Sequence, residues 1–430
     1  MATPSPSGGI GRVLSQRNYR LYFIGNSVSI LGFWVYRTAI GWLTWELTGS
    51  PAWLGIIGFV STAPAVFVAP FAGAVADRFG LRRVATLALA FNAVNGSVLA
   101  FLAFAGLVSV EVILLIALLH GLAVAFDLPA RVALVPDLIE KGDLSAAIAL
   151  NSAVFHAGAF VGPALFAGLN AVGPIAWSFV FNAAGYFVFV ATFLLMRQTE
   201  APKPASAVKK GLFLDVVEGL RYVAVHKEIL AVFLLSATGH LLLRPYIDLL
   251  PGFSAGVFGR GAEGYAVLLS TVGAGSIASG IWLARRGRTR GLARVMVVSL
   301  AASALALLVF ALGTSFALAL VCMFFAGFFL LSVAVSNQSL VQNRLPREVR
   351  GRVVSISTAM AMGFPALGCW SSAPSAISPA SRRRWRGPRS SPRFCSSPWR
   401  GASSAPPRSW RRIGRRTSRE KSKAWKPRNA

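Results

Sequence analysis

The chain has 430 residues, of which 55% are hydrophobic and 13% charged, and its mean hydropathy is +0.61. Apolar residues are spread along most of the chain rather than collected in one core, so the composition excludes an ordinary water-soluble domain and predicts several membrane spans. The formal net charge of +28 does not indicate a nucleic-acid partner, because the segment from Cys369 to Ala430, with 14 Arg, 3 Lys and 1 acidic residue, contributes +16 of it.

Ten apolar segments are long enough to cross a bilayer as helices, which takes about 20 residues at a rise of about 1.5 Å each. They lie at residues 20–47, 53–76, 84–106, 110–131, 146–170, 174–197, 228–251, 262–284, 291–313 and 316–342. A further apolar run begins at Val353 and ends at about Gly368. The sequence therefore predicts an all-α membrane protein with six spans in its first part and four in its second.

Lys and Arg residues alternate between the loops. They collect in the loops after the second, fourth, sixth, eighth and tenth predicted spans, whereas the intervening loops are nearly free of them. By the positive-inside rule we expect the basic loops and the amino terminus on the cytoplasmic side. In that position the basic loops also meet anionic membrane lipids.

Three pairs of landmarks recur at nearly one spacing along the chain. The segment GAVADRFGLRR at 73–83 returns in degenerate form as GIWLARRGRTR at 280–290, an offset of 207 residues. Arg37 and Arg244, each alone inside an apolar run, have the same offset, and a third pair of segments recurs at an offset of 206. A repeat of this length predicts two fused helical bundles.

The second bundle is incomplete. By the repeat, the apolar segment 174–197 should recur near 381–404, where the chain instead reads SRRRWRGPRSSPRFCSSPWRGASS. The composition changes abruptly after Gly368, and five of the eleven tryptophans lie beyond it. In GC-rich coding DNA, triplets for Ala, Gly and Leu readily yield Arg, Ser, Pro and Trp when they are read out of register. We therefore expect residues 369–430 to be a disordered basic tail produced by a reading-frame shift.

These boundaries predict four parts: a six-helix first half at 1–197, a cytoplasmic linker at 198–227, an incomplete second half at 228–368 and the basic tail. Apolar residues recur at helical spacing in the linker, at Phe213, Val216, Val217, Leu220 and Val223. This pattern predicts an amphipathic helix that either lies on the inner membrane surface or packs on the bundle.

The loop between the second and third predicted spans carries a motif of glycines and charged residues. Its members are Gly73, Asp77, Arg78, Gly80, Arg82 and Arg83. At this position the motif resembles the loop signature of the major facilitator superfamily. The segments FDLPARVALVPDLI and VQNRLPREVRGRVVS resemble the enterobactin-exporter-like and macrolide-efflux-like branch of that superfamily. The resemblance covers roughly residues 14–368, although Leu81 stands where a basic residue is commoner and Ala284 replaces the acid in the second copy.

This resemblance implies a bundle of two pseudo-symmetric six-helix halves in the bacterial cytoplasmic membrane, with the second half truncated here. It implies transport by alternating access, in which the halves rock around a midplane site. It also implies a gating role for the loop motif, whose charges would latch the outward-open state. The alternative is a basic loop in which one acid compensates part of the charge.

Ionisable residues inside the spans are candidates for the substrate and proton pathway, because charge within a bilayer is costly. Arg37 and Arg244 occupy equivalent places in the first and seventh spans, and Asp248 is expected to share a helix face with Arg244, four residues before it. His120 and His240 are candidate proton carriers, because histidine titrates near neutral pH. The alternatives are arginines that reach to the outer interface and histidines that only pack.

Asp127 and Arg131 close the fourth predicted span, with Pro129 between them. Their spacing resembles the inner gate of the family, where an acid and a base exchange partners as the halves rock. The alternative is a helix cap that anchors the span among anionic headgroups.

The sequence contains no phosphate-binding glycine loop followed by Lys and Ser or Thr, no Cys/His ligand cluster and no nucleophile elbow. We therefore expect no enzyme activity, no cofactor and no metal. The resemblance implies a monomeric exporter of a small amphipathic molecule, such as a siderophore or a macrolide, that works as an antiporter with protons as the coupling ion. The alternative is a non-transporting, truncated remnant of such an exporter.

Overall fold

A computed structural model of the chain describes residues 10–140, 142–197, 221–286 and 291–345, together with single residues between 353 and 368. Eight helices of the described part are long and apolar enough to cross a membrane. Two more long helices, of 32 and 29 residues, occupy the places of the first and second predicted spans. The all-α architecture predicted from the sequence is confirmed.

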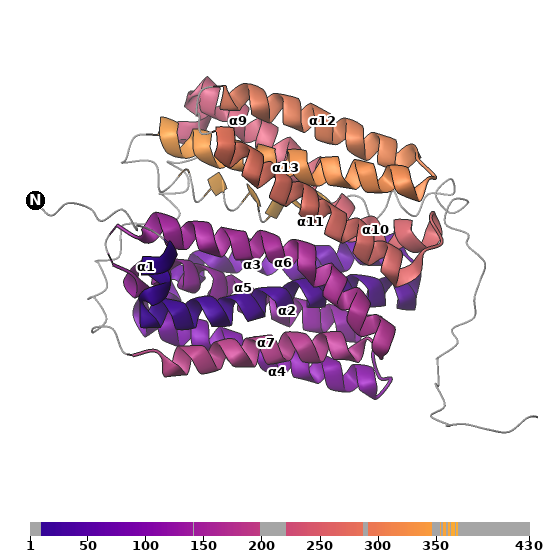
Figure 1. The fold of residues 1–430 in the computed structure, drawn as a ribbon, viewed down its shortest axis with the longest axis horizontal. Coiled ribbons are helices and arrows are strands. Elements are labelled where there is room, and N and C mark those ends of the chain that lie inside the picture. Colours follow the sequence, from indigo (N-terminus) through magenta and orange to yellow (C-terminus); the bar gives the residue numbers. More distant parts are fainter. Residues whose placement is uncertain are drawn as a thin grey trace, which may run out of the picture. The chain divides into compact units, whose positions relative to one another are not determined.

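The first half is built from α1 to α7 (Figure 1). Its elements are α1 (Ile10–Ser15), α2 (Arg17–Thr48), α3 (Pro51–Phe79), α4 (Leu81–Phe104), α5 (Val110–Leu134), the 3₁₀ turn η1 (Val135–Leu138), α6 (Leu144–Val172) and α7 (Ala176–Leu195). The long helix α2 packs against both α6 and α7, while α4 packs against α5 and α7 and α3 packs against α5. Helix α2 therefore runs through the middle of this half.

The second half contains four more spans (Figure 1). Its elements are α9 (Lys227–Thr238), the π-helical turn η2 (Gly239–Leu243), α10 (Tyr246–Gly256), α11 (Gly261–Arg286), α12 (Leu292–Leu312) and α13 (Phe316–Arg344). The predicted seventh span, 228–251, is thus not one regular helix. Arg244 and Pro245 lie between the π-helical turn and α10, and a proline lacks the N–H that would continue a helix.

The apolar run after Val353 belongs to the same half. Its described residues are helical. Val353 and Ile356 are buried in a cluster with Val223, Phe233 and Val341. A Cβ on Gly368 would lie against the backbone carbonyl of Leu241 in η2. The end of the predicted linker helix therefore packs on the bundle at Val223, while residues 198–220 and 369–430 lie outside the described residues.

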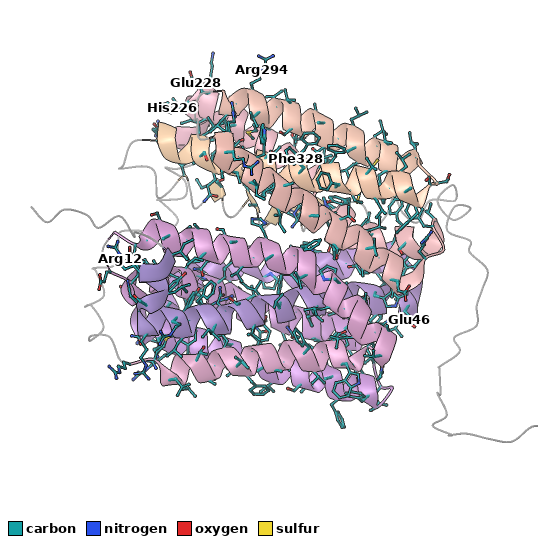
Figure 2. The ribbon with its side chains drawn as sticks, in the orientation of Figure 1. Arg12, Glu46, His226, Glu228, Arg294 and Phe328 are labelled. Carbon is teal, nitrogen blue, oxygen red and sulfur yellow. The ribbon has the colours of Figure 1, made fainter. Side chains whose placement is uncertain are left out.

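Helix α1 fastens the amino-terminal end of the first half. The Arg12 guanidinium, labelled in Figure 2, donates to both carboxylate oxygens of Asp143 at the start of α6. Gln16 donates to the same carboxylate over 3.1 Å and accepts from the backbone N–H of Glu140 over 3.0 Å. These contacts lie wholly within the first half.

Two glycines bring α11 and α13 into backbone contact. A Cβ on Gly275 would clash with the carbonyl oxygen of Phe324, and one on Gly327 would clash with the carbonyl oxygen of Val272. The Ser279 and Ser332 hydroxyls form a buried hydrogen bond of 2.8 Å across the same interface. Small residues that allow this approach are what stabilises helix pairs in lipid, where apolar tails give little hydrophobic gain.

We predict that Gly275→Ala and Gly327→Ala each lower the melting temperature of the purified protein in detergent. The added methyl group must push the two backbones apart, and overpacking of this kind costs about 1–3 kcal/mol. The control is Gly168→Ala in α6, where a Cβ would meet no atom within 4 Å. Because alanine favours helix over glycine, the control should melt at the same or a higher temperature. Equal melting of all three variants would contradict the close contact.

Candidate functional site

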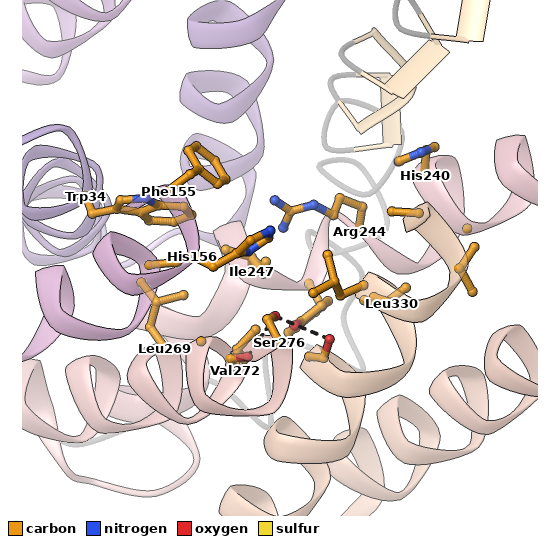
Figure 3. A pocket seen from close by; sticks show the side chains of 18 of the residues that line it. Trp34, Phe155, His156, His240, Arg244, Ile247, Leu269, Val272, Ser276 and Leu330 are labelled. Atoms are coloured by element: carbon orange, nitrogen blue, oxygen red, sulfur yellow. Dashed lines mark hydrogen bonds between the residues drawn. The ribbon is translucent and has the colours of Figure 1, made fainter. Parts of the chain in front are cut away.

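A cavity of about 180 Å³ lies between the two halves (Figure 3). Trp34 of α2 and Phe155, His156 and Ala159 of α6 line it from the first half. The second half contributes residues of α9, η2, α10, α11 and α13. Because both halves supply its walls, the shape of this cavity depends on how the halves are arranged.

Glycines of α6 shape the first-half wall. The Trp34 and Phe155 rings meet edge to face, with centroids 5.4 Å apart. A Cβ on Gly158 would lie 2.9 Å from Cδ1 of Trp34, and one on Gly162 would clash with its Cβ. The indole is 6% exposed, and its Nε1–H has no hydrogen-bond partner among the described residues. The close packing of α2 on α6 therefore fixes a buried donor beside the cavity.

The interrupted seventh span supplies the opposite wall. The backbone N–H of Arg244 bonds to Gly239 five residues earlier, over 3.0 Å, and the N–H of Asp248 bonds to Pro245 over 3.1 Å. His240 and Arg244 both line the cavity. In Figure 3 the Arg244 guanidinium extends towards His156, Trp34 and Phe155, while His240 lies on the other side of Arg244.

Asp248 forms an ion pair with the first half. Its carboxylate oxygen lies 2.7 Å from Nη2 of Arg37 in α2, and the two side chains are 20% and 23% exposed. The sequence predicted a regular helix on which Asp248 and Arg244 would share a face. The π-helical turn ends at Leu243 and α10 begins at Tyr246, while the residues between them keep right-handed helical dihedrals, so the shared face stays a prediction. The repeat-related Arg37 lies against Asp248.

Further contacts surround this pair and join the halves. A Cβ on Gly41 would lie 3.0 Å from the Tyr265 hydroxyl, so the glycine lets α2 approach α11 closely. Ser270 of α11 donates to the carbonyl of Phe160 in α6 over 3.0 Å. Trp42 of α2 packs against hydrophobic clusters of both halves. Beside the cavity, the Arg37–Asp248 ion pair and close helix contacts therefore join the halves.

The predicted inner-gate residues lie inside the first half. Arg131 Nη2 is 2.6 Å from a carboxylate oxygen of Asp127, whose side chain is 1% exposed. Arg131 also donates to Asn26 of α2 over 2.9 Å, and its guanidinium lies 5.5 Å from the ring centroid of Phe189 in α7. This buried network connects α5 with α2 and α7, and it does not have the exposure that an anchor among headgroups requires.

His120 is buried among aromatic rings of the first half. Its ring centroid is 4.6 Å from that of Tyr36 and 6.2 Å from those of Phe33 and Tyr186. Its Nε2 has no hydrogen-bond partner among the described residues, and it is not among the residues that line the cavity. The surroundings of His120 are those of a packing residue.

The predicted gating loop is mostly helical: Gly73, Asp77 and Arg78 belong to the end of α3, Arg82 and Arg83 to the start of α4, and only Gly80 lies in the turn between them. Gly80 has φ +92°, a conformation that L side chains rarely adopt. Arg82 donates to the carbonyls of Phe193 and Met196 at the end of α7, where a cation meets the negative end of the helix dipole. Arg78 and Arg83 are exposed. The surroundings of Gly73 and of the Asp77 side chain lie outside what the structure describes, so the latch stays a prediction.

Sequence reasoning missed several residues of the cavity wall. His156 interrupts the apolar run 146–170, which is the same signal that identified His120 and His240. Trp34 and Phe155 are indistinguishable by sequence from other aromatic packing residues. Of the predicted pathway residues, the structure brings His240 and Arg244 to the cavity and Arg37 and Asp248 to the contact between the halves.

Comparison with known proteins gives three informative relatives. The staphyloferrin A transporter of Staphylococcus aureus is 25% identical over 347 residues, which cover 78% of this chain and 84% of the relative. An enterobactin exporter of Shigella boydii is 23% identical, with coverage of 81% and 83%. The macrolide efflux protein A of Streptococcus pyogenes is 21% identical, with coverage of 81% and 88%.

A solved structure has the same fold. The nucleoside transporter NupG superposes with a TM-score of 0.62 at 17% sequence identity, over 82% of this chain and 90% of that chain. The family model described as transmembrane secretion effector matches residues 12–376. These matches confirm the resemblance that the loop motif indicated. The chain belongs to the transmembrane secretion effector family of the major facilitator superfamily, whose members are transporters and not enzymes.

Proposed function

We propose that the protein is a secondary active exporter of a small amphipathic molecule, which it moves out of the bacterial cytoplasm in exchange for protons. The observation that carries this proposal is the cavity walled by both halves beside the Arg37–Asp248 ion pair. An enterobactin exporter and a macrolide efflux protein among the relatives support export as the direction.

Alternating access follows from the position of the ion pair along the chain. With the amino terminus in the cytoplasm, α2 runs outwards and Arg37 lies in its outer part. Asp248 lies equally late in the seventh span. The pair, with Gly41 and Ser270 beside it, then closes the outer side of the cavity. Release of cargo to the outside requires these contacts to separate, and reloading requires them to form again.

The small volume of the cavity supports a mechanism in which the two halves move apart to admit the cargo. Pockets for drug-sized ligands usually measure about 300–1,000 Å³, whereas this one is about 180 Å³. A siderophore or a macrolide therefore fits only when the halves separate further. We assign proton movement to His156 and His240, the histidines that line the cavity, and the inner gate to the Asp127–Arg131 pair.

We predict that Arg37→Gln or Asp248→Asn increases the fraction of molecules with the outer side open. Each change removes the attraction and leaves one charge without this partner. Spin labels at Leu107, in the loop after α4, and at Leu312, the last residue of α12, would report the distance between the halves on the outer side by double electron–electron resonance. The background would lack Cys322, Cys369 and Cys395.

The matched control is Asp143→Asn, which breaks the Arg12–Asp143 ion pair inside one half. This variant should leave the distance distribution unchanged. Distance distributions that are identical in the wild type and in both ion-pair variants would refute the closing role of Arg37 and Asp248.

Transport itself is tested with the full chain reconstituted in lipid vesicles. An imposed gradient that is acidic inside should drive accumulation of erythromycin or enterobactin in vesicles, because exit of protons through inside-out molecules drives uptake of cargo. Addition of a protonophore should abolish the accumulation. If folded protein accumulates neither compound above the level of empty vesicles, the alternative of a non-transporting remnant is favoured instead.

We further propose that residues 369–430 arise from a reading-frame shift and that the second half is incomplete. The end of the family match at residue 376, close to Gly368, supports this division. We predict that one alternative frame of the encoding DNA after codon 368 continues the eleventh span and encodes a twelfth. Sequencing of this region decides the matter, and the absence of an apolar span from both alternative frames would argue against the shift.

A further inference from the structure

Basic side chains predominate over acidic ones among the described residues that line the cavity. The described residues that line it include one arginine, Arg244, and two histidines, His156 and His240, but neither aspartate nor glutamate. The nearby carboxylate of Asp248 lies 2.7 Å from Arg37, on the side of the other half. Among the described residues at the cavity and the ion pair, two arginines therefore outnumber one carboxylate, and this charge favours an anion.

Two hydrogen-bond donors add to this asymmetry. The Nε1–H of Trp34 and the hydroxyl of Tyr246 belong to cavity-lining residues, are buried, and have no hydrogen-bond partner among the described residues. An indole N–H can only donate. Leaving a buried donor without an acceptor costs free energy, so a ligand that brings acceptors is favoured over one that brings donors.

The rest of the wall is apolar. Phe155 and the Trp34 ring form one face, and Leu269, Val272 and Leu330 contribute aliphatic side chains. Ser276 already donates its hydroxyl proton towards the backbone carbonyl of Val272 over 3.0 Å. Arg244 and His156 therefore lie close together in the wall, with apolar side chains such as Ile247 and Leu330 around them (Figure 3).

We propose that this cavity selects an anionic cargo, with a carboxylate or a similar acceptor group held by Arg244 and an apolar or aromatic body packed against Trp34 and Phe155. A guanidinium binds a carboxylate through two parallel N–H donors, which a neutral ligand of the same shape cannot use as well. A cationic ligand is repelled by the same group. This inference rests on the proposed export function and names the chemical class of the molecule exported.

The test uses three probes that share one aromatic body and differ in charge: 2-naphthylacetate, 2-naphthylethanol and 2-naphthylethylamine. Binding to the full chain in phosphatidylcholine nanodiscs is measured by isothermal titration calorimetry at pH 7. We expect the acetate to bind at least about tenfold more tightly than the alcohol, since hydrogen bonds to charged groups are the stronger ones. The amine should bind most weakly.

Four variants test whether the preference for the acetate arises from residues of the cavity. Arg244→Gln should remove the advantage of the acetate over the alcohol, whereas Arg244→Lys should keep part of it, because only the charge is retained. Trp34→Phe keeps the ring and removes the donor, and should weaken binding of the acetate more than of the amine. Arg260→Gln is the control, because Arg260 stacks on Phe316 at 4.6 Å and does not line the cavity.

Equal or tighter binding of the amine by the wild type would overturn the proposal, as would an anion preference that survives Arg244→Gln. A preference present in phosphatidylcholine but lost in phosphatidylglycerol nanodiscs would assign the site to a lipid headgroup and overturn the cargo assignment. Vesicle transport separates the two proposals. Export of the amine as fast as the acetate refutes anion selection alone, while selective binding without any transport refutes export alone.

Discussion

The arrangement of the two halves depends on the cost of placing charge within a bilayer. An arginine or an aspartate at the centre of a spanning helix costs about 2.5–3.5 kcal/mol on insertion scales, so such residues pair or face a cavity. Arg37 and Asp248 meet this requirement by pairing across the halves at 2.7 Å. Each half therefore carries a charge that is compensated best in one arrangement of the bundle, which makes the arrangement sensitive to anything that competes for either partner.

Much of the fold could be predicted because hydrophobic periodicity and span length are local properties. The predicted spans 84–106 and 316–342 correspond to Leu81–Phe104 and Phe316–Arg344. The seventh span departs from its prediction at Pro245, and this proline was itself a signal that a regular helix could not continue. Hydropathy alone cannot detect such a break, because the residues on both sides remain apolar.

The candidate site could be predicted only in part. Charge inside an apolar run identified Arg37, Arg244 and Asp248, since that signal requires no knowledge of neighbours. The partner of Asp248 is 211 positions away in the chain, so no local pattern could supply it. The burial of the Trp34 Nε1–H group, which has no hydrogen-bond partner among the described residues, likewise depends on Gly158 and Gly162 of another helix, α6. Long-range packing, rather than residue type, decides which polar groups a ligand can reach.

The interruption of the seventh span places Arg244 at the wall of the cavity and Asp248 on the short helix α10 that directly follows. Only one turn of chain separates the residue that lines the cavity from the residue that joins the halves. If Arg244 holds the cargo as proposed, binding acts on the start of α10, and a shift of α10 changes the geometry of the binding site. Under that proposal, binding of the cargo and closure of the halves are linked equilibria, and each changes the free energy of the other by the same amount.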